Sequence, residues 1–163
     1  MIEVREMSDA ENIGILKGAG FGYLGMVEGD DPYVVPIHYV YIEPDIYIYT
    51  TEGMKWEIIQ DNPKVCLNVA EVIDPRDWKS VVVRGNAIRL ESDDEVKQAR
   101  SELLKVDPTL TPAVSVQWMD HWVRENIEVI LKIEPRSITG RCSVKGSEIN
   151  TPFVPTRKEP KPL

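Results

Sequence analysis

Two threonines, a glycine and a lysine stand close together where a predicted strand gives way to a predicted helix. The predicted strand DIYIYT (45–50) ends at Thr50 and is followed by Thr51. The helix is expected to begin near Gly53, with Lys55 in its first turn. First-turn N–H groups, the helix dipole and one cation are the groups that bind a phosphate monoester. The segment predicts a phosphate site, although taken alone it is better explained by a helix that Thr51 caps and a solvated Lys55.

A proline inside an apolar strand is the second feature. Pro36 interrupts YVVPIHYVY (33–41) and has no N–H to give to a strand ladder. The break predicts that main-chain groups of Val35 and Ile37 are free to face a planar ligand with polar edges. An ordinary edge-strand proline explains the strand equally well.

The sequence has two histidines, His38 and His121. His38 lies in the proline-containing strand, where hydrogen bonding to a ligand and filling a half-buried position are equally good interpretations. His121 lies in an aromatic segment with Trp118 and Trp122, for which packing is the simpler interpretation. Covering a bound ring from a second subunit is the alternative, since dimer interfaces favour tryptophan.

Short helices are predicted in the connections of a β-rich chain. Ser8 and Glu11 have the spacing of a capping box, which predicts a helix that ends near Gly18–Gly20. A second helix is predicted through about residue 106 from a similar signal at 92–95, and a third after Thr111. The acidic run Asp93–Glu95 is interpreted as helix-start electrostatics and not as a metal site.

Six segments are predicted to form strands, the fifth with a bulge or bend at Gly85 and the last with an edge position or a kink at Pro135. Their ranges are 21–27, 33–41, 45–50, 64–70, 78–90 and 128–140. Strands in this number, with short helices between them, predict a mainly β fold with short helices (α+β), built as a six-stranded antiparallel β-barrel.

The composition is that of one domain followed by a tail. The 163 residues include 19 Lys and Arg against 27 Asp and Glu, and a net charge of −8 argues against a nucleic-acid partner. Cys66 and Cys142 form no CxxC motif, so neither zinc nor a disulfide scaffold is expected. No segment resembles a signal peptide or a membrane span, so a cytoplasmic location is expected. Residues 1–145 are predicted to form the domain, and 146–163, with four prolines, an extended or mobile tail.

The order of these segments resembles the FMN-binding split β-barrel family. This is the pyridoxamine 5′-phosphate oxidase-related group, and the nitroimidazole-resistance-like branch is the most similar. The resemblance covers residues 1–142 and is strongest at PYVVPI (32–37), IYxxTxxGxK (46–55), NPxVC (62–66) and WxSVxxxGxA (78–87).

The resemblance implies that FMN is the cofactor, and it also implies a homodimer with two flavin sites, each built from both chains. The residues that match the family's flavin-binding positions are Val35, Pro36, Ile37 and His38 along the ring, Tyr49, Thr50, Thr51, Gly53 and Lys55 near the ribityl chain and phosphate, and Trp78, Lys79 and Ser80 beside the flavin.

The chain departs from the family pattern at three places. Met54 stands where many relatives have Arg or another polar residue, so phosphate affinity should depend more on Lys55 and the backbone. Thr50 stands where many members of the branch have His, so chemistry linked to that histidine is not expected. The C-terminal Arg-Leu-x-Pro signature of true pyridoxine phosphate oxidases is absent, and vitamin B6 oxidation is therefore not expected.

Three functions are compatible with these features. The favoured one is an FMN-dependent oxidoreductase that transfers hydride or electrons to or from a small molecule, with NAD(P)H as a candidate donor. The alternatives are a non-catalytic flavin-binding or electron-carrier protein, and a haem-binding relative with His38 or His121 as axial ligand. The sequence identifies neither a catalytic residue nor the substrate, because the predicted loops 72–79 and 106–126 would shape the open side of the site.

Overall fold

The computed structural model describes residues 2–106 and 127–144. The third predicted helix, His121 and the tail from residue 146 lie outside the described residues. All predicted site residues lie within them.

The helices are α1 (Asp9–Ala19), α2 (Met54–Asp61) and α3 (Asp93–Val106). The capping box is confirmed: Ser8 Oγ accepts from the Glu11 N–H at 3.3 Å, and Glu11 Oε2 accepts from the Ser8 N–H at 2.8 Å. Gly20 ends α1 with a φ of 65°, in the left-handed region that favours glycine. None of the helices among the described residues is long and apolar enough to cross a membrane.

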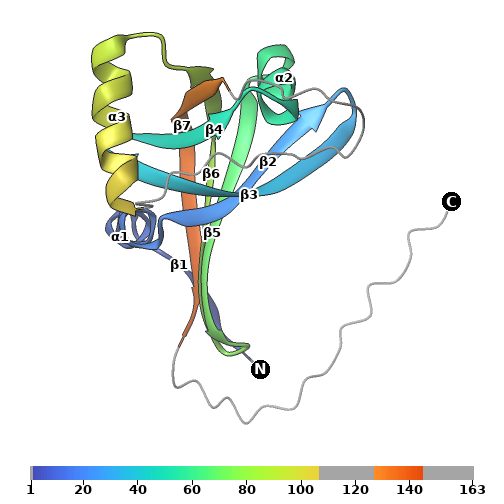
Figure 1. The fold of residues 1–163 in the computed structure, drawn as a ribbon. Helices are drawn as coiled ribbons and strands as arrows, with labels where there is room; N and C mark the ends of the chain where they lie inside the picture. The colour runs from blue at the N-terminus through green and yellow to red at the C-terminus, as the bar shows by residue number, and fades with distance from the viewer. Residues whose placement is uncertain (1, 107–126, 145–163) are drawn as a thin grey trace, which may run out of the picture.

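The strands form one antiparallel sheet in the order β1-β7-β4-β3-β2-β5-β6, and β6 also pairs with β7. Six strands thus close into the predicted barrel, and β1 adds a short edge that the sequence did not reveal (Figure 1). The bounds are β1 (Val4–Glu6), β2 (Phe21–Glu28), β3 (Asp31–Ile42), β4 (Asp45–Thr51), β5 (Lys64–Asp74), β6 (Asp77–Arg89) and β7 (Glu128–Ser143).

The predicted irregularities at Gly85 and Pro135 form a single feature. The register between β6 and β7 shifts between Arg84 and Gly85, and Gly85 is paired with Pro135. A Cβ at position 85 would fall on the carbonyl oxygen of Glu134, so only glycine allows this approach. On its other side β7 is paired with β4 only up to Ile133 and with β1 only from Arg141, so Pro135 lies at a locally unpaired edge of β7 and beside the shifted register.

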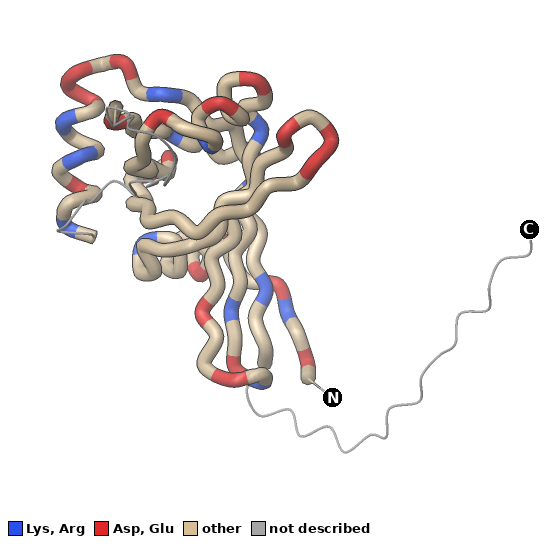
Figure 2. Tube along the Cα trace, turned by 45° about the vertical axis from the view of Figure 1, so that its right-hand side comes forward, with Lys and Arg blue, Asp and Glu red and all other residues tan. Residues whose placement is uncertain are grey.

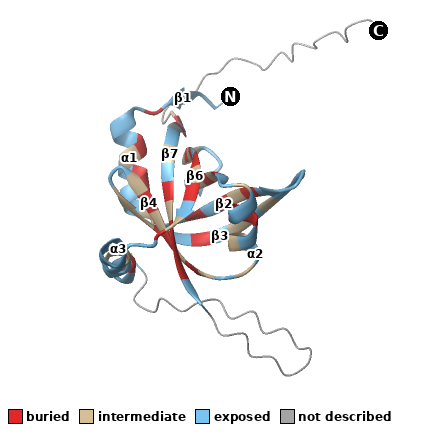
Figure 3. Ribbon diagram, turned by 90° about the horizontal axis from the view of Figure 1, so that it is seen from above, coloured by how far each residue is buried: buried red, intermediate tan, exposed pale blue. Residues whose placement is uncertain are grey.

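The barrel interior is filled by the inward-facing side chains of the strands. Among them are Leu24, Leu67, Val83 and Leu131, none of which is measurably exposed. Figure 3 shows the alternation of buried and exposed residues along the strands. A second cluster lies outside the barrel, where α3 packs Ala99 and Leu103 against β4 and β7. Both sides of β4 are therefore covered.

The barrel is split between β3 and β4. Their pairing runs from Ile42↔Asp45 to Tyr39↔Ile48 and stops there. Beyond that point β3 is paired only with β2, while β4 continues along β7 to Thr51. The two strands diverge, and α2, which follows β4 and packs against β2, lies at the open end (Figure 1).

Candidate functional site

The turn between β4 and α2 exposes backbone donors. The N-cap of α2 is Gly53, and no side chain caps the helix. The explanation in which Thr51 caps it is therefore wrong. A Cβ built at Gly53 would meet nothing within 4 Å, so there is open space beside the first-turn amides. These amides can receive an anion, because they have no partner within the helix.

Lys55 is the cation of this turn. Its side chain is half-buried, and among the described residues it has neither an ion-pair nor a hydrogen-bond partner. Burial lowers the pKa of the ammonium group from its usual 10.5. A desolvated charge without a counter-charge is unfavourable, and an anion bound beside it would remove that cost.

Side chains alternate along β4, so Thr50 lies on one side of the strand and Tyr49 and Thr51 on the other. Thr50 points inward and is 6% exposed, while Thr51 is half-buried at the strand end. Tyr49 points the other way and packs in the α3 cluster. Burial, followed by the nearby Glu128 carboxylate, raises the pKa of Tyr49 to about 12. The phenol of Tyr49 therefore lies on the opposite side of β4 from the Thr50 side chain.

Three residues that were not predicted to belong to the site meet at the same turn. Arg89, at the end of β6, donates from Nη1 to Glu52 Oε1 at 2.8 Å, and its Cζ lies 5.5 Å from the centre of the Trp56 ring. Glu52 directly precedes Gly53, and Trp56 is in the first turn of α2, where it packs against the core. The interaction ties the barrel to the turn through a salt bridge and a cation–π contact.

The predicted free edge of β3 exists, but different residues provide it. Tyr39 donates its N–H to the Gly20 carbonyl, toward β2, so by alternation Val35 and Ile37 also direct their main-chain groups toward β2. The expectation that these two residues supply the free groups is wrong. Val34 and Pro36 direct theirs to the edge that β4 leaves open, and the Val35 and Ile37 side chains point into the barrel.

An exposed apolar cluster covers the outer side of β2 and β3. This outer patch consists of Phe21, Tyr23, Val34, Pro36 and His38. The rings of Phe21 and Tyr23 meet edge to face at 5.7 Å, and those of Phe21 and His38 at 5.3 Å. Tyr23 is 50% exposed and Val34 62%. Large apolar groups gathered in this way are typical of an interaction surface.

The predicted site residues of β6 lie further along the same outer side. Asn68 of β5 is paired with Tyr23 and donates from Nδ2 to Ser80 Oγ at 2.9 Å. Trp78, two residues before Ser80, shares its side of the strand and donates its N–H to Ser143 Oγ at 3.0 Å. Asn68 is therefore a further candidate for the site. The sequence did not indicate it, because Asn68 stands in a strand whose other residues are mostly apolar.

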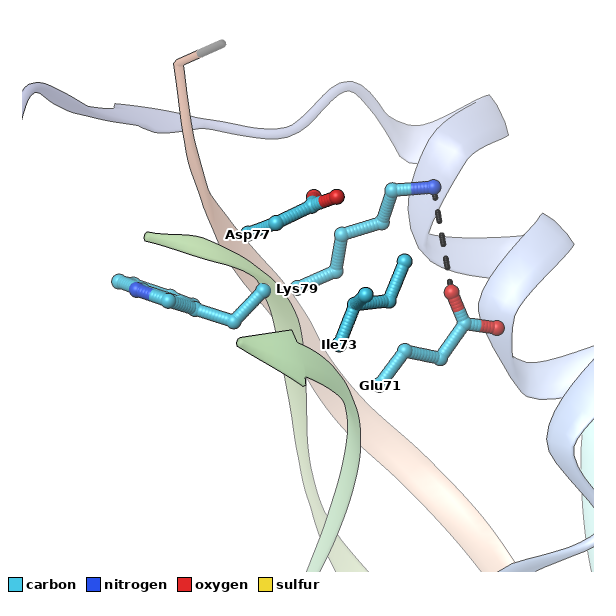
Figure 4. Close-up of a pocket in the computed structure, with 5 residues that line it drawn as sticks. Glu71, Ile73, Asp77 and Lys79 are labelled. Carbon is cyan, nitrogen blue, oxygen red and sulfur yellow. Dashed lines mark ion pairs between the residues drawn. The ribbon is translucent and has the colours of Figure 1, made fainter. Parts of the chain in front are cut away.

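Lys79 points to the opposite side, toward α1. Its Nζ lies 3.9 Å from Glu71 Oε2, and both side chains are about half exposed. Figure 4 shows the two residues with Ile73 and Asp77 around a shallow depression of about 200 Å³. The structure does not bring Lys79 to the side of β6 where Ser80 lies.

Within one chain, the predicted site residues form two separate groups. Lys79 and Arg89 are ten residues apart on the same strand, about 33 Å at the usual rise per residue. The group around Trp78 and Ser80 is therefore far from the turn that holds Gly53 and Lys55. In Figure 1 the β5–β6 turn and α2 lie at opposite ends of the molecule, and Figure 2 shows the same separation from another side.

Known proteins with this fold provide a comparison. Residues 8–142 match the family model described as pyridoxamine 5′-phosphate oxidase. A solved FAD-binding protein of Mesorhizobium loti is 27% identical, with a TM-score of 0.72 over 89% of this chain and 100% of that one. A candidate 5-nitroimidazole antibiotic resistance protein of Bacteroides thetaiotaomicron is 18% identical, with a TM-score of 0.67 over 88% of this chain and 89% of that one.

A curated relative adds a local match. Uncharacterized protein RA0666 of Rhizobium meliloti (strain 1021) is 39% identical over 82 residues, which are 50% of this chain. The match spans about half of that relative, 54% of its length. The family match covers most of the chain and every predicted site residue, and the barrel has the split that the resemblance implies. The chain belongs to the pyridoxamine 5′-phosphate oxidase-like family of split β-barrels.

Proposed function

We propose that this protein binds FMN and acts as an oxidoreductase on a small molecule. The observation that carries the proposal is the half-buried ammonium of Lys55, which has no partner among the described residues and lies in the first turn of a helix that no side chain caps. Backbone amides, an open glycine and one desolvated cation fit the terminal phosphate of FMN.

FMN is favoured over FAD on grounds of charge. A terminal phosphate monoester has a charge between about −1.5 and −2 at neutral pH, whereas each phosphate of a pyrophosphate diester has about −1. The desolvated Lys55 gains more from the more highly charged group. The Mesorhizobium loti relative binds FAD by its description, so FAD is included in the test below.

The ring system would lie along the open edge of β3. Val34 and Pro36 present main-chain groups there, and Pro36 offers a carbonyl without a competing N–H. These groups can pair with the polar edge of the flavin and fix its orientation. The bound flavin supplies the hydride or electron transfer, and the chain contributes binding, orientation and exclusion of water.

The complete site would need a second copy of the chain. The outer patch is large, apolar and unpaired among the described residues, and a twofold contact would bury it against the same patch of a partner. Such a contact would also allow the Trp78–Ser80 group of one chain to approach the turn of the other. A homodimer with two shared flavin sites accounts for the separation of about 33 Å within one chain.

The proposal is tested by titrating the purified protein with FMN, FAD and riboflavin and following flavin fluorescence. Lys55→Ala removes a charge-assisted hydrogen bond worth about 1.5–3 kcal/mol, so FMN should bind roughly ten- to a hundredfold more weakly. Riboflavin has no phosphate and should bind unchanged. Lys55→Arg should retain part of the FMN affinity.

Lys64→Ala is the matched control, since Lys64 is exposed and lies just beyond the other end of α2. It should leave all three affinities unchanged. Equal FMN affinity in wild type and Lys55→Ala would place the phosphate elsewhere. Equal losses for FMN and riboflavin would assign Lys55 to the fold or the ring pocket, and tighter binding of FAD than FMN would replace the proposed cofactor.

Catalysis is tested separately on the flavin-loaded protein. Oxidation of NADH or NADPH, followed with oxygen and with small quinone or nitroaromatic acceptors, should exceed that of free FMN at equal concentration. A loaded protein that accepts electrons but turns over no faster than free FMN would be an electron carrier. A haem spectrum in the purified protein would contradict the flavin proposal.

A further inference from the structure

We propose that Arg89 is a positioning residue of the phosphate site: it neutralises Glu52 and keeps this carboxylate from repelling a phosphate bound at the Gly53–Lys55 turn. The inference rests on the proposed function. It concerns an interaction between the end of β6 and the turn before α2, described above as a salt bridge and a cation–π contact.

The sequence of the turn poses an electrostatic problem. Glu52 is the one carboxylate in the segment Thr50–Lys55, and it directly precedes the glycine whose neighbouring amides would receive the phosphate. Like charges a few ångströms apart repel strongly where solvent is partly excluded. With Glu52 ionised and unpaired, its charge would offset that of Lys55, and the turn would have no net positive charge.

The structure resolves this conflict through Arg89. Its guanidinium is held on two sides, by Glu52 Oε1 at 2.8 Å and by the Trp56 ring 5.5 Å from Cζ. The side chains of Arg89 and Glu52 are only 33% and 38% exposed, so water screens the pair less than a fully exposed one. The carboxylate is therefore both neutralised and fixed in position.

Arg89 is well placed to act as a rigid anchor. It is paired with Leu131 of β7, which is completely buried, so its backbone belongs to the barrel wall and not to a loop. Trp56 packs against the barrel core. Glu52 also donates its N–H to the Ile127 carbonyl at 2.9 Å, which ties the turn to the segment that enters β7.

The test is a double-mutant cycle in the full chain, with FMN and riboflavin as the two probes. Arg89→Met leaves the Glu52 charge uncompensated and should raise the Kd for FMN roughly three- to thirtyfold, with riboflavin unchanged. Glu52→Gln alone should not weaken FMN binding, because it removes the negative charge of the pair and leaves the positive charge of Arg89. The combination of Glu52→Gln with Arg89→Met should restore FMN affinity to near the wild-type value.

Arg5→Met is the matched control, because it breaks another close arginine–glutamate pair, with Glu11, on β1 and α1. It should leave both flavin affinities unchanged. Thermal unfolding of each variant shows whether it is folded at the titration temperature. Glu52→Gln breaks the Arg89–Glu52 pair with a smaller change in side-chain shape than Arg89→Met.

Rescue in the double variant supports the proposal, because a merely structural Arg89 could not be replaced by removing its partner's charge. If the double variant binds FMN as weakly as Arg89→Met alone, the proposal is overturned, and Arg89 touches the phosphate itself. Equal losses for FMN and riboflavin would also overturn it. Failure of the phosphate site is distinguished by Lys55→Ala, which would then leave FMN affinity unchanged.

Discussion

The side-chain oxygen of Asn12 occupies the space that a Cβ at Gly140 would need. Asn12 lies in α1 and is 2% exposed, and its Oδ1 has no hydrogen-bond partner among the described residues. The carbonyl of Gly140 accepts the Met7 N–H at 2.9 Å, so β7 meets both α1 and the segment before it at this glycine. The absence of a side chain at one position thus allows the helix to approach the sheet.

Gly140→Ala should therefore destabilise the protein. The added methyl group would displace Asn12 and press on Met7 Sδ, 3.3 Å away. Overpacking of this kind costs about 1–3 kcal/mol of unfolding free energy, measured by urea titration. Gly14→Ala is the control, since its Cβ would meet nothing within 4 Å, and it should stabilise α1 by up to about 1 kcal/mol. An unchanged stability in Gly140→Ala would show that α1 can move away at no cost.

Acid should weaken the ion pair between Arg5 of β1 and Glu11 of α1. The Arg5 guanidinium, followed by the Ser8 backbone N–H, lowers the pKa of Glu11 to about 2 from 4.5. A carboxyl whose pKa is lower in the folded state contributes stability above about pH 4.5 and loses it as the pH falls through about 2. The urea midpoint of the wild type should thus fall across this range more steeply than that of Glu11→Gln.

Arg5→Met should flatten the same pH profile, and adding Glu11→Gln to it should have little further effect on its slope, because the two residues act as one pair. Parallel profiles for wild type and Glu11→Gln would mean that the pair persists in the unfolded chain or contributes nothing to stability. The comparison uses differences between variants, so other carboxyl groups that titrate in this range cancel.

The affinity for FMN should have an alkaline limit that riboflavin does not share. Charged Lys55 is the form that binds phosphate, so affinity falls as the pH rises through its pKa. Burial lowers this pKa, and the loss should begin below 10.5. An acidic limit near pH 6 is also expected, where the phosphate takes up its second proton. Fluorescence titrations of both flavins from about pH 5 to about pH 10 provide the measurement.

Lys55→Ala should remove the alkaline limit and keep the acidic one. Riboflavin corrects for ionisation of the ring itself, because both flavins share that ring. Should the alkaline limit persist in Lys55→Ala, another group at the site must titrate there.

A charge placed in the outer patch should separate the proposed dimer. Val34→Glu puts a carboxylate at a position that is 62% exposed in one chain and would be buried between two. Light scattering at micromolar concentration should return the dimer mass for wild type and the monomer mass for the variant, and the variant should lose flavin as well. Leu104→Glu, at an exposed position of α3, should change neither. A monomeric wild type with flavin bound would contradict the shared site.

Local signals predicted much of the fold. The Ser8–Glu11 capping box and the left-handed Gly20 depend on a few neighbouring residues, and both were predictable from the sequence. The three residues of β1 are too few for alternation to show, and they became a strand only because β7 extends far enough to pair with them. The start of α2 near Gly53 was also predicted, but the capping role of Thr51 was not found, because no side chain caps this helix.

The candidate site was harder to predict. Its composition depends on which side of a strand each side chain lies and on contacts between residues far apart in the sequence. The strand DIYIYT has large residues on both sides, so alternation alone could not tell that α3 would cover Tyr49 while Thr50 faced the barrel. Arg89 meets Glu52 across 37 positions of sequence, and no local pattern marks that contact. The free main-chain groups of β3 belong to Val34 and Pro36 and not to Val35 and Ile37 as predicted. The sequence does not show which edge of β3 pairs with β2.

The length of β6 has a consequence for mixtures of variants. If Ser80 at one end of the strand and Lys55 near the other serve different halves of one flavin site, each site draws one half from each chain. A dimer of one chain defective at Ser80 and one chain defective at Lys55 then has one site with both defects and one with neither. Two inactive proteins, unfolded together and refolded at equal concentration, would regain flavin in the mixed dimers, as in intersubunit complementation between alleles.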